Sequence, residues 1–218
     1  MTKVKICGIT NVEDARCAVE AGADFLGFIL YPKSPRYITP EQIASITLTI
    51  RDEFGAQTPR FVGVFVNETV ERVKTAIHVA GLDLAQLHGD ERPLEVKALF
   101  PYAFKALRPQ TPGEAETALA RFRPVFLQND DLPQLLVDAY HPQHYGGTGT
   151  QADIDIAQWL SRPIRLLLAG GLTPENVAAA IAQAQPWGVD VSSGVEASKG
   201  IKDHGRIRAF TSAAKNLI

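Results

Sequence analysis

The sequence predicts an α/β protein that folds as a single-domain (β/α)8 barrel of the TIM type, and three observations predict it. Strand-like and helix-like segments alternate almost to the end of the chain, as in a parallel sheet with crossover helices. About eight such units fit into 218 residues, a length that α/β barrels commonly fill as one domain. Since no linker, low-complexity tract or charge block divides the chain, residues 1–218 are expected to form one domain.

The expected strands are short runs rich in apolar, β-branched and aromatic residues, which suit a buried parallel sheet. They are expected over Lys3–Cys7, Phe25–Leu30, Phe61–Val66, Leu82–Leu87, Ala103–Leu107, Leu135–Ala139, Ile164–Ala169 and Gly188–Val191. The segment from Arg123 to Pro133 is the least regular part of the chain, and its run Pro124–Leu127 resembles a strand. Because Leu135–Ala139 is the stronger candidate for the sixth strand, Pro124–Leu127 is expected to be a connection.

Helix-start residues follow several of these strands. Thr10 or Asn11 can cap the first helix, and acidic residues follow in its first turn. Pro40 is well placed in the first turn of the second helix, and Asn67 is expected to cap the third. Helices are further expected over Val12–Ala21, Gly113–Arg121, Asp153–Leu160, Pro174–Ala184 and Asp203–Leu217.

An open, doubly wound sheet is the structural alternative to the closed barrel. Such a sheet would bind a dinucleotide at a Gly-x-Gly-x-x-Gly turn after its first strand. The first turn here reads Cys7-Gly8-Ile9-Thr10 and lacks this fingerprint. The sequence therefore favours the barrel.

Composition and charge narrow the possible partners and the location. The formal net charge of -2 gives no overall attraction for nucleic acid or for an anionic membrane. The two cysteines are too few for a disulfide framework, and no apolar leader or membrane-spanning stretch is visible, so a cytoplasmic protein is expected. Neither a Walker lysine motif nor a cluster of metal ligands is present in the sequence.

Polar residues gather where the expected strands end, which is where the active sites of such barrels lie. These residues are Cys7, Arg36, Gln86, His88, Asp138, Asp190 and Ser192. Alternation along the first strand places Lys5 on the same face as Cys7. Because a buried ammonium needs a partner, Lys5 is expected to point inward and to pair with an acid such as Asp190. The competing interpretation of Cys7 is a small buried hydrophobic residue, as most free cysteines are.

Three glycine-rich loops follow the late strands, at Gly146–Gly149, Ala169–Pro174 and Ser192–Gly194. Glycine lets backbone N–H groups turn toward an anion, and barrels usually bind phosphate after the seventh and eighth strands. Three loops in these places indicate a phosphate site rather than mere turns. The candidate phosphate-binding residues are Gly147, Gly149, Gly170, Gly171, Ser192, Ser193 and Gly194. The residues expected to play structural or solvated surface roles are Cys17, His78, His141, His144 and His204.

Several blocks of the sequence, in order over nearly the whole chain, match motifs of a known family. The blocks are Lys5–Thr10, Gly22–Phe28, Ser34–Arg36, Gln86–Gly89, Gly146–Gly149, Ala169–Val177 and Asp190–Glu196. Together they resemble the phosphoribosylanthranilate isomerases of tryptophan biosynthesis. The resemblance implies a (β/α)8 barrel that converts N-(5'-phosphoribosyl)anthranilate to 1-(2-carboxyphenylamino)-1'-deoxyribulose 5'-phosphate by an Amadori rearrangement. It also implies a small phosphoribosyl substrate as the partner, without cofactor or metal.

By this resemblance, Cys7 is the general base and Asp138 the general acid of the rearrangement. The base must lose its proton, and Lys5 on the same face is expected to favour the thiolate. The acid must start protonated at neutral pH. Arg36 resembles the partner of the anthranilate carboxylate, since its planar fork suits a bidentate contact. His88 is expected to line the anthranilate side, although capping of the next helix is an alternative role.

The sequence departs from the family pattern in two places. The aspartate of the sixth strand follows Leu136-Val137 instead of a leucine pair, and Asp138 is the acid available there. The family's Phe-Asp-Trp after the glycine-rich loop is replaced by Ala152-Asp153-Ile154, which keeps the acid and loses the aromatic residues.

Two other functions remain open at this stage. A related isomerase of histidine biosynthesis does similar chemistry with two aspartates, and the cysteine at position 7 speaks against it. A non-catalytic barrel that binds a phosphorylated ligand would need neither an inward acid nor a thiol. The sequence allows either a monomer or a homodimer.

Overall fold

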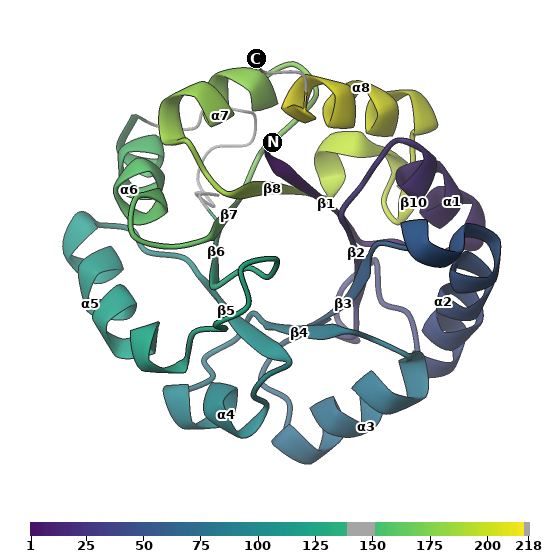
Figure 1. Cartoon of the computed structure of the whole chain (residues 1–218), viewed down its shortest axis with the longest axis horizontal. Coiled ribbons are helices and arrows are strands. Elements are labelled where there is room, and N and C mark those ends of the chain that lie inside the picture. The colour runs from purple at the N-terminus through teal and green to yellow at the C-terminus, as the bar shows by residue number, and fades with distance from the viewer. Residues whose placement is uncertain (139–150, 216–218) are drawn as a thin grey trace.

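The computed structural model describes residues 1–138 and 151–215, and within them eight parallel strands close into a barrel in the order β1 to β8. The strands are β1 Lys3–Cys7, β2 Phe25–Ile29, β3 Arg60–Phe65, β4 Leu84–Leu87, β5 Ala103–Leu107, β6 Leu135–Asp138, β7 Leu166–Ala169 and β8 Gly188–Val191. Figure 1 shows this ring of strands surrounded by a ring of helices. The helices are α1 Val12–Glu20, α2 Pro40–Phe54, α3 Val70–Ala80, α4 Pro93–Ala98, α5 Pro112–Phe122, α6 Gln151–Ser161, α7 Val177–Ala184 and α8 His204–Lys215.

The predicted (β/α)8 barrel is confirmed, and the open sheet is wrong. Strand β1 pairs in parallel with β2 on one side and with β8 on the other, which closes the ring. In this register Lys5 lies beside Phe25 of β2 and Asp190 of β8, so all three stand at one level of the barrel. The predicted strands are found with small shifts at their ends; the expected last residue of the sixth, Ala139, lies outside the described residues.

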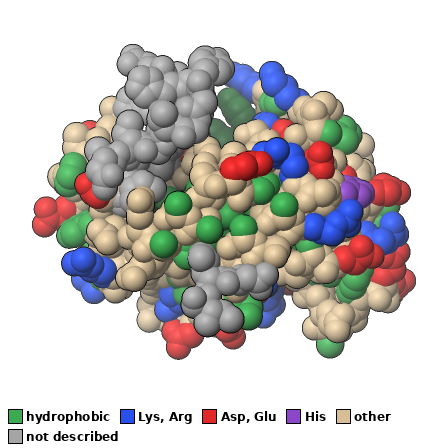
Figure 2. Space-filling view, turned by 90° about the horizontal axis from the view of Figure 1, so that it is seen from above, with side chains coloured by type: hydrophobic (Ala, Val, Ile, Leu, Met, Phe, Trp, Pro, Cys, Tyr) green, Lys and Arg blue, Asp and Glu red, His purple; other side chains and the backbone are tan. Residues whose placement is uncertain are grey.

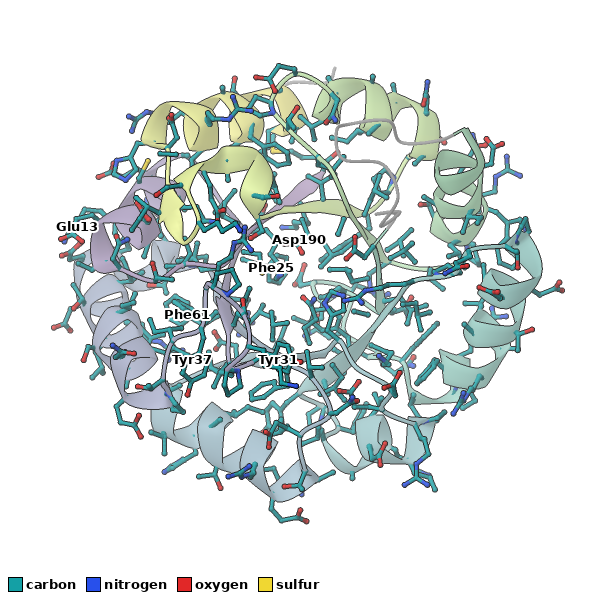
Figure 3. The ribbon with its side chains drawn as sticks, turned by 180° about the vertical axis from the view of Figure 1, so that it is seen from behind. Glu13, Phe25, Tyr31, Tyr37, Phe61 and Asp190 are labelled. Carbon is teal, nitrogen blue, oxygen red and sulfur yellow. The ribbon has the colours of Figure 1, made fainter. Side chains whose placement is uncertain are left out.

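The barrel has two cores, one inside the ring of strands and one between the strands and the helices. The inner core is a cluster that contains Phe25, Val62, Leu84, Phe104, Leu136 and Leu167. The outer core contains Val4, Ile6 and Phe61, and Figure 3 shows Phe61 outside the ring, whereas Phe25 and Asp190 lie within it. Because strand side chains alternate, burial of Val4 and Ile6 outside leaves Lys5 and Cys7 inside.

Two expected helix starts differ in the structure. Thr69, not Asn67, caps α3 by accepting a hydrogen bond from Arg72 N. Asn67 has a positive φ of 54° and its side chain bonds to Asp90 instead, with Asp90 N donating to Oδ1. Helix α7 begins at Val177, because Asn176 accepts from Thr173 N and closes a turn before the helix. A tertiary contact of Asn67 thus goes with the start of α3 at Thr69, whereas a local turn at Asn176 sets the start of α7.

Some short elements have no counterpart in the sequence prediction. Helix α4 had no predicted bounds, and Arg92 rather than His88 lies at its N-cap. The run Pro124–Leu127 begins within a 3-10 turn over Arg123–Val125, so it is not a strand. After β8 a second small sheet forms from β9 Glu196–Ser198 and β10 Ile201–Lys202, which pair antiparallel. This β9–β10 hairpin lies outside the barrel next to α1 (Figure 1). In the part of the chain that the structure describes, no helix is long and apolar enough to cross a membrane.

Charged side chains are mixed over the described surface. In Figure 2, basic and acidic groups lie next to one another over the described part of the visible face, without a broad area of either sign. Such a surface, with a formal net charge of -2, gives no general attraction for a polyanion. An anionic substrate must therefore be held by a local arrangement of donors.

Candidate active site

A cavity of about 310 Å³ opens where the barrel strands end, and it collects the described candidate residues of the sequence analysis. Its lining includes Cys7, Arg36, His88, Asp138, Gly170, Gly171, Ser192, Ser193 and Gly194. Cys7 comes from β1 and Asp138 from β6, three strands away around the ring. The predicted base and the predicted acid therefore share one cavity. Gly147 and Gly149 lie outside the described residues.

Lys5 and Asp190 form the buried ion pair that the sequence analysis predicted. Lys5 Nζ lies 2.9 Å from Asp190 Oδ1, and the lysine side chain is fully buried. Burial pulls the pKa of Lys5 down, but the carboxylate of Asp190 and the sulfur of Cys7 together raise it above its ordinary value. Lys5 therefore stays protonated and places a positive charge beneath Cys7.

Cys7 is buried, and its sulfur fits because β2 carries a glycine beside it. A Cβ at Gly27 would lie 2.7 Å from Cys7 Sγ and 3.1 Å from Lys5 Nζ, so a side chain there would collide with both. Burial raises the pKa of the Cys7 thiol, whereas the neighbouring Lys5 ammonium lowers it, and burial is the larger effect. The expectation that Lys5 favours the thiolate is thus confirmed in direction, although burial outweighs it and the pKa of Cys7 is raised overall.

Arg36 reaches the cavity from the loop after β2 and is already held by a carboxylate. Its Nε lies 2.6 Å from Glu196 Oε1 and its Nη2 lies 2.7 Å from Glu196 Oε2, a bidentate pair. Lys202 Nζ contacts the same carboxylate at 3.0 Å. The pKa of Arg36 is raised, chiefly by its hydrogen bonds to Glu196.

On the other side of the cavity, His88 and Arg108 approach Asp138. His88 Nε2 lies 3.7 Å and Arg108 Nε lies 3.8 Å from Asp138 Oδ2. The amide nitrogen of Gln86 lies 3.0 Å from His88 Nδ1, and His88 Nε2 is the ring nitrogen that faces Asp138. The distances from His88 Nε2 and Arg108 Nε to Asp138 Oδ2 are both longer than a hydrogen bond.

The glycine-rich segments after β7 and β8 pack closely against each other. A Cβ at Gly194 would collide with the carbonyl oxygen of Leu172, so only glycine lets the two loops meet. Gly170 and Gly171 have positive φ values of 98° and 61°, a conformation that favours glycine. The hydroxyl of Ser192 is buried and bonds to no other described atom. Such a hydroxyl is free to donate to a bound anion.

Comparison with known proteins decides the family. A model of the family "N-(5'phosphoribosyl)anthranilate (PRA) isomerase" matches residues 4–213. The chain belongs to this family. A curated N-(5'-phosphoribosyl)anthranilate isomerase from Geobacter sp. (strain M21) is 46% identical over 220 residues, which cover 100% of both chains. The chain is accordingly an isomerase that acts on N-(5'-phosphoribosyl)anthranilate in tryptophan biosynthesis.

Solved structures of family members have the same barrel. A phosphoribosylanthranilate isomerase from Thermotoga maritima matches with a TM-score of 0.86 and 39% identity over 100% of both chains. A second matching structure, with a TM-score of 0.83 and 38% identity over 100% of both chains, is a complex with reduced 1-(o-carboxyphenylamino)-1-deoxyribulose 5-phosphate. A family member thus binds an analogue of the rearranged sugar phosphate.

Sequence reasoning about this isomerase missed the partners that hold Arg36 and Asp138. Glu196 lies within a quoted motif, but nothing in the sequence pairs it with Arg36, 160 residues away. Lys202 belongs to a strand of two residues, too short to show a period. Arg108 has one signal that was available, since it directly follows the expected fifth strand.

A second, wider cavity of about 880 Å³ adjoins the candidate active site on the side of β4 and β5. His88 lines both cavities, and Lys105 and Arg108 line the wider one. Lys105 is buried and bonds to the carbonyl oxygens of Leu87 and Gly89 at 2.9 and 2.7 Å. It also pairs with a buried acid, at 3.1 Å from Glu91 Oε2.

Of the residues expected to be structural or solvated, Cys17 and His78 behave as predicted. Cys17 is buried in α1 and His78 is exposed. His204 lies at the surface with its side chain 41% exposed, and its Nε2 also lies 2.9 Å from Asp14 Oδ1, a contact that was not predicted. His141 and His144 lie outside the described residues.

Proposed function

We propose that the chain carries out its isomerisation as an Amadori rearrangement in which Cys7 is the general base and Asp138 the general acid. The observation that carries the proposal is that both side chains line one cavity of about 310 Å³ from strands three places apart. A sugar between them would meet the acid at one position and the base at another. This arrangement suits a reaction that needs one proton delivered and another removed.

The proton transfers follow from the chemistry of the substrate. Asp138 gives its proton to the ribose ring oxygen as the bond from that oxygen to C1' breaks, and the nitrogen lone pair forms a double bond to C1'. Cys7 then removes the proton from C2', and the electron pair moves to give an enol-amine. Tautomerisation of the enol-amine yields the ketone, so C2' is oxidised and C1' reduced within one molecule.

Cys7 acts in this scheme as a thiolate that is a minor species at neutral pH, because burial raises the pKa of the thiol. The Lys5 ammonium, fixed by Asp190, supports the thiolate against this cost. Since the base must be deprotonated, kcat/KM is expected to rise with pH on the alkaline side of neutrality. A pH–rate profile without a rising limb that depends on Cys7 would count against this role.

The remaining described residues would bind the two ends of the substrate. Arg36 is proposed to contact the anthranilate carboxylate, and His88 to line the anthranilate side near Asp138. The proposed phosphate-binding residues are Gly147, Gly149, Gly170, Gly171, Ser192, Ser193 and Gly194. Support comes from the buried, unbonded hydroxyl of Ser192 and from the positive φ values of Gly170 and Gly171. We also propose that residues 1–218 form one domain and that the protein works in the cytoplasm.

The test measures turnover of phosphoribosylanthranilate by loss of fluorescence for the wild type, Cys7→Ser and Asp138→Asn. Each substitution removes one proton transfer and is expected to lower kcat by about 10²- to 10⁴-fold. Binding of a reduced product analogue, measured by calorimetry, should stay within a few-fold of the wild type. Cys17→Ala is the matched control, because Cys17 is a buried thiol in α1 outside the cavity, and it should keep full activity.

Two outcomes would overturn the proposal. If either Cys7→Ser or Asp138→Asn keeps kcat within tenfold of the wild type, that residue is not the acid or base. If the wild type itself binds the analogue but turns nothing over, the chain is a non-catalytic phosphate-binding barrel.

A further inference from the structure

The β9–β10 hairpin lies outside the barrel, yet it places two buried charges against the candidate active site. Glu196 of β9 and Lys202 of β10 have side chains that are 5% and 0% exposed. The backbone N–H of Lys202 donates to Asp14 Oδ2 at 2.9 Å, and this hydrogen bond ties the hairpin to α1. Buried charges outside a core need a reason, because taking them out of water is costly.

Both charges converge on Arg36 and on the loop after β8. The carboxylate of Glu196 receives the Nε and Nη2 edge of Arg36 and, at Oε1, the ammonium of Lys202. Lys202 Nζ also donates to the carbonyl oxygen of Ser192 at 3.1 Å. One ammonium therefore connects the carboxylate that holds Arg36 with the backbone of the proposed phosphate loop.

The same groups crowd around the residue that follows Cys7. A Cβ at Gly8, which has a φ of 75°, would lie 2.7 Å from Arg36 Cδ, 2.9 Å from Ser192 Oγ and 3.5 Å from Lys202 Nζ. Arg36 thus has little room to change its path past β1. With its Nε and Nη2 edge bound to Glu196, the Nη1 edge is the part of the guanidinium that makes no bond to another described residue.

We propose that Glu196 and Lys202 are positioning residues, which hold Arg36 so that its Nη1 edge is presented to the carboxylate on the substrate's anthranilate ring. The inference rests on the proposed carboxylate contact of Arg36. A free arginine would lose rotamer freedom when it binds, and Glu196 removes that cost by fixing the side chain in the folded chain. The pair therefore contributes selectivity for a ring that carries a carboxylate.

The test compares two ligands that differ only in that carboxylate. One is reduced 1-(o-carboxyphenylamino)-1-deoxyribulose 5-phosphate, and the other is the same compound without the ring carboxylate. Calorimetry gives the ratio of their dissociation constants. Glu196→Gln is expected to lower the preference for the carboxylated ligand by about 10- to 100-fold, because the guanidinium loses its fixed orientation. Binding of the carboxyl-free ligand should stay within about threefold of the wild type.

Three variants make the result specific. Arg36→Met should abolish the preference, which tests the carboxylate contact itself. Glu53→Gln is the matched control, because Glu53 holds Arg16 in a bidentate pair of the same kind, at 2.8 and 2.7 Å, on exposed helix surfaces. It should leave both affinities unchanged. If Glu196→Gln fails to fold with Lys202 unpaired, the double variant Glu196→Gln/Lys202→Met removes both charges and should show the same loss of preference.

Each contrary result has a distinct meaning. Equal weakening of both ligands by Glu196→Gln would show a merely structural role and overturn the inference. An unchanged preference in Glu196→Gln, together with its loss in Arg36→Met, would overturn the inference and leave the proposed function intact. If Arg36→Met keeps the preference, Arg36 does not bind the carboxylate, and both the contact and the inference fail.

Discussion

The two walls of the candidate active site are built differently. The wall from β8, β1 and β2, here called the base wall, contains Cys7, the buried ion pair Lys5–Asp190 at 2.9 Å and the partly buried ion pair Arg36–Glu196 at 2.6 Å. The wall from β4 to β6, the acid wall, brings His88 and Arg108 no closer than 3.7 and 3.8 Å to Asp138. Figure 1 shows the two sets of strands on different sides of the ring. Among the described residues, the base wall is thus held by short ion pairs, whereas the contacts of His88 and Arg108 with Asp138 in the acid wall are longer.

Each wall contains a buried lysine, and the different surroundings of the two lysines illustrate the difference between the walls. The ammonium of Lys5 has the carboxylate of Asp190 as its partner, so its pKa is raised and its charge acts on the thiol of Cys7. Lys105 of the acid wall donates mainly to backbone carbonyl oxygens below His88, and burial lowers its pKa against the effect of Glu91. The first lysine acts on the thiol of the proposed base, whereas the second fixes the backbone that carries His88.

The largest effect is expected from breaking the ion pair of the base wall. Asp190→Leu leaves the Lys5 ammonium buried without its carboxylate and should lower the free energy of unfolding by about 3–5 kcal/mol. In the double variant Lys5→Met/Asp190→Leu the unpaired charge is gone, so the protein should regain most of the lost free energy of unfolding. Urea denaturation of the two variants measures both values. A loss below about 1 kcal/mol in the single variant would mean that the pair does not hold the wall.

A smaller effect is expected where a glycine makes room for the thiol. Gly27→Ala places a Cβ 2.7 Å from Cys7 Sγ, so the sulfur must move, and kcat should fall by about 10- to 100-fold. Overpacking of this kind should also cost about 1–3 kcal/mol of stability. The measurement is turnover together with urea denaturation.

Gly63→Ala is the control for this substitution. A Cβ at Gly63, on the neighbouring strand β3, would lie 2.6 Å from Leu82 Cδ1 and 2.8 Å from Phe65 Cε2, away from the cavity. It should cost similar stability and leave kcat of the folded protein within about twofold of the wild type. Equal losses of kcat in both variants would show that general strain, not the position of Cys7, is responsible.

The base wall was also the more predictable of the two from sequence. Alternation within β1 puts Lys5 and Cys7 on one face, and Asp190 is the acid that the last strand offers. The net direction of the Cys7 pKa was not predictable, because it depends on how deeply the sulfur is buried. The barrel itself could be predicted because the alternation of strand-like and helix-like segments is visible in short stretches of the sequence.

Contacts between distant segments without a regular pattern could not be predicted from the sequence. Glu196 meets Arg36 across 160 residues, through a hairpin whose strands are too short to show alternation. Asn67 has the composition of a helix cap, but Asp90 from the loop after β4 binds its side chain and Thr69 takes the cap. In both cases a tertiary partner outweighs the local preference.

The smallest effect is expected in the acid wall, from Arg108. Its side chain is 62% exposed and its Nε lies 3.8 Å from Asp138 Oδ2, so solvent and salt screen the attraction. Arg108→Gln should therefore change stability by less than about 1 kcal/mol and kcat by no more than about threefold, with the small loss of kcat shrinking further at high salt. The measurement is kcat at low and high ionic strength. A loss of kcat as large as that of Gly27→Ala would mean that the acid wall, too, depends on a fixed charge, and the contrast between the two walls would not hold.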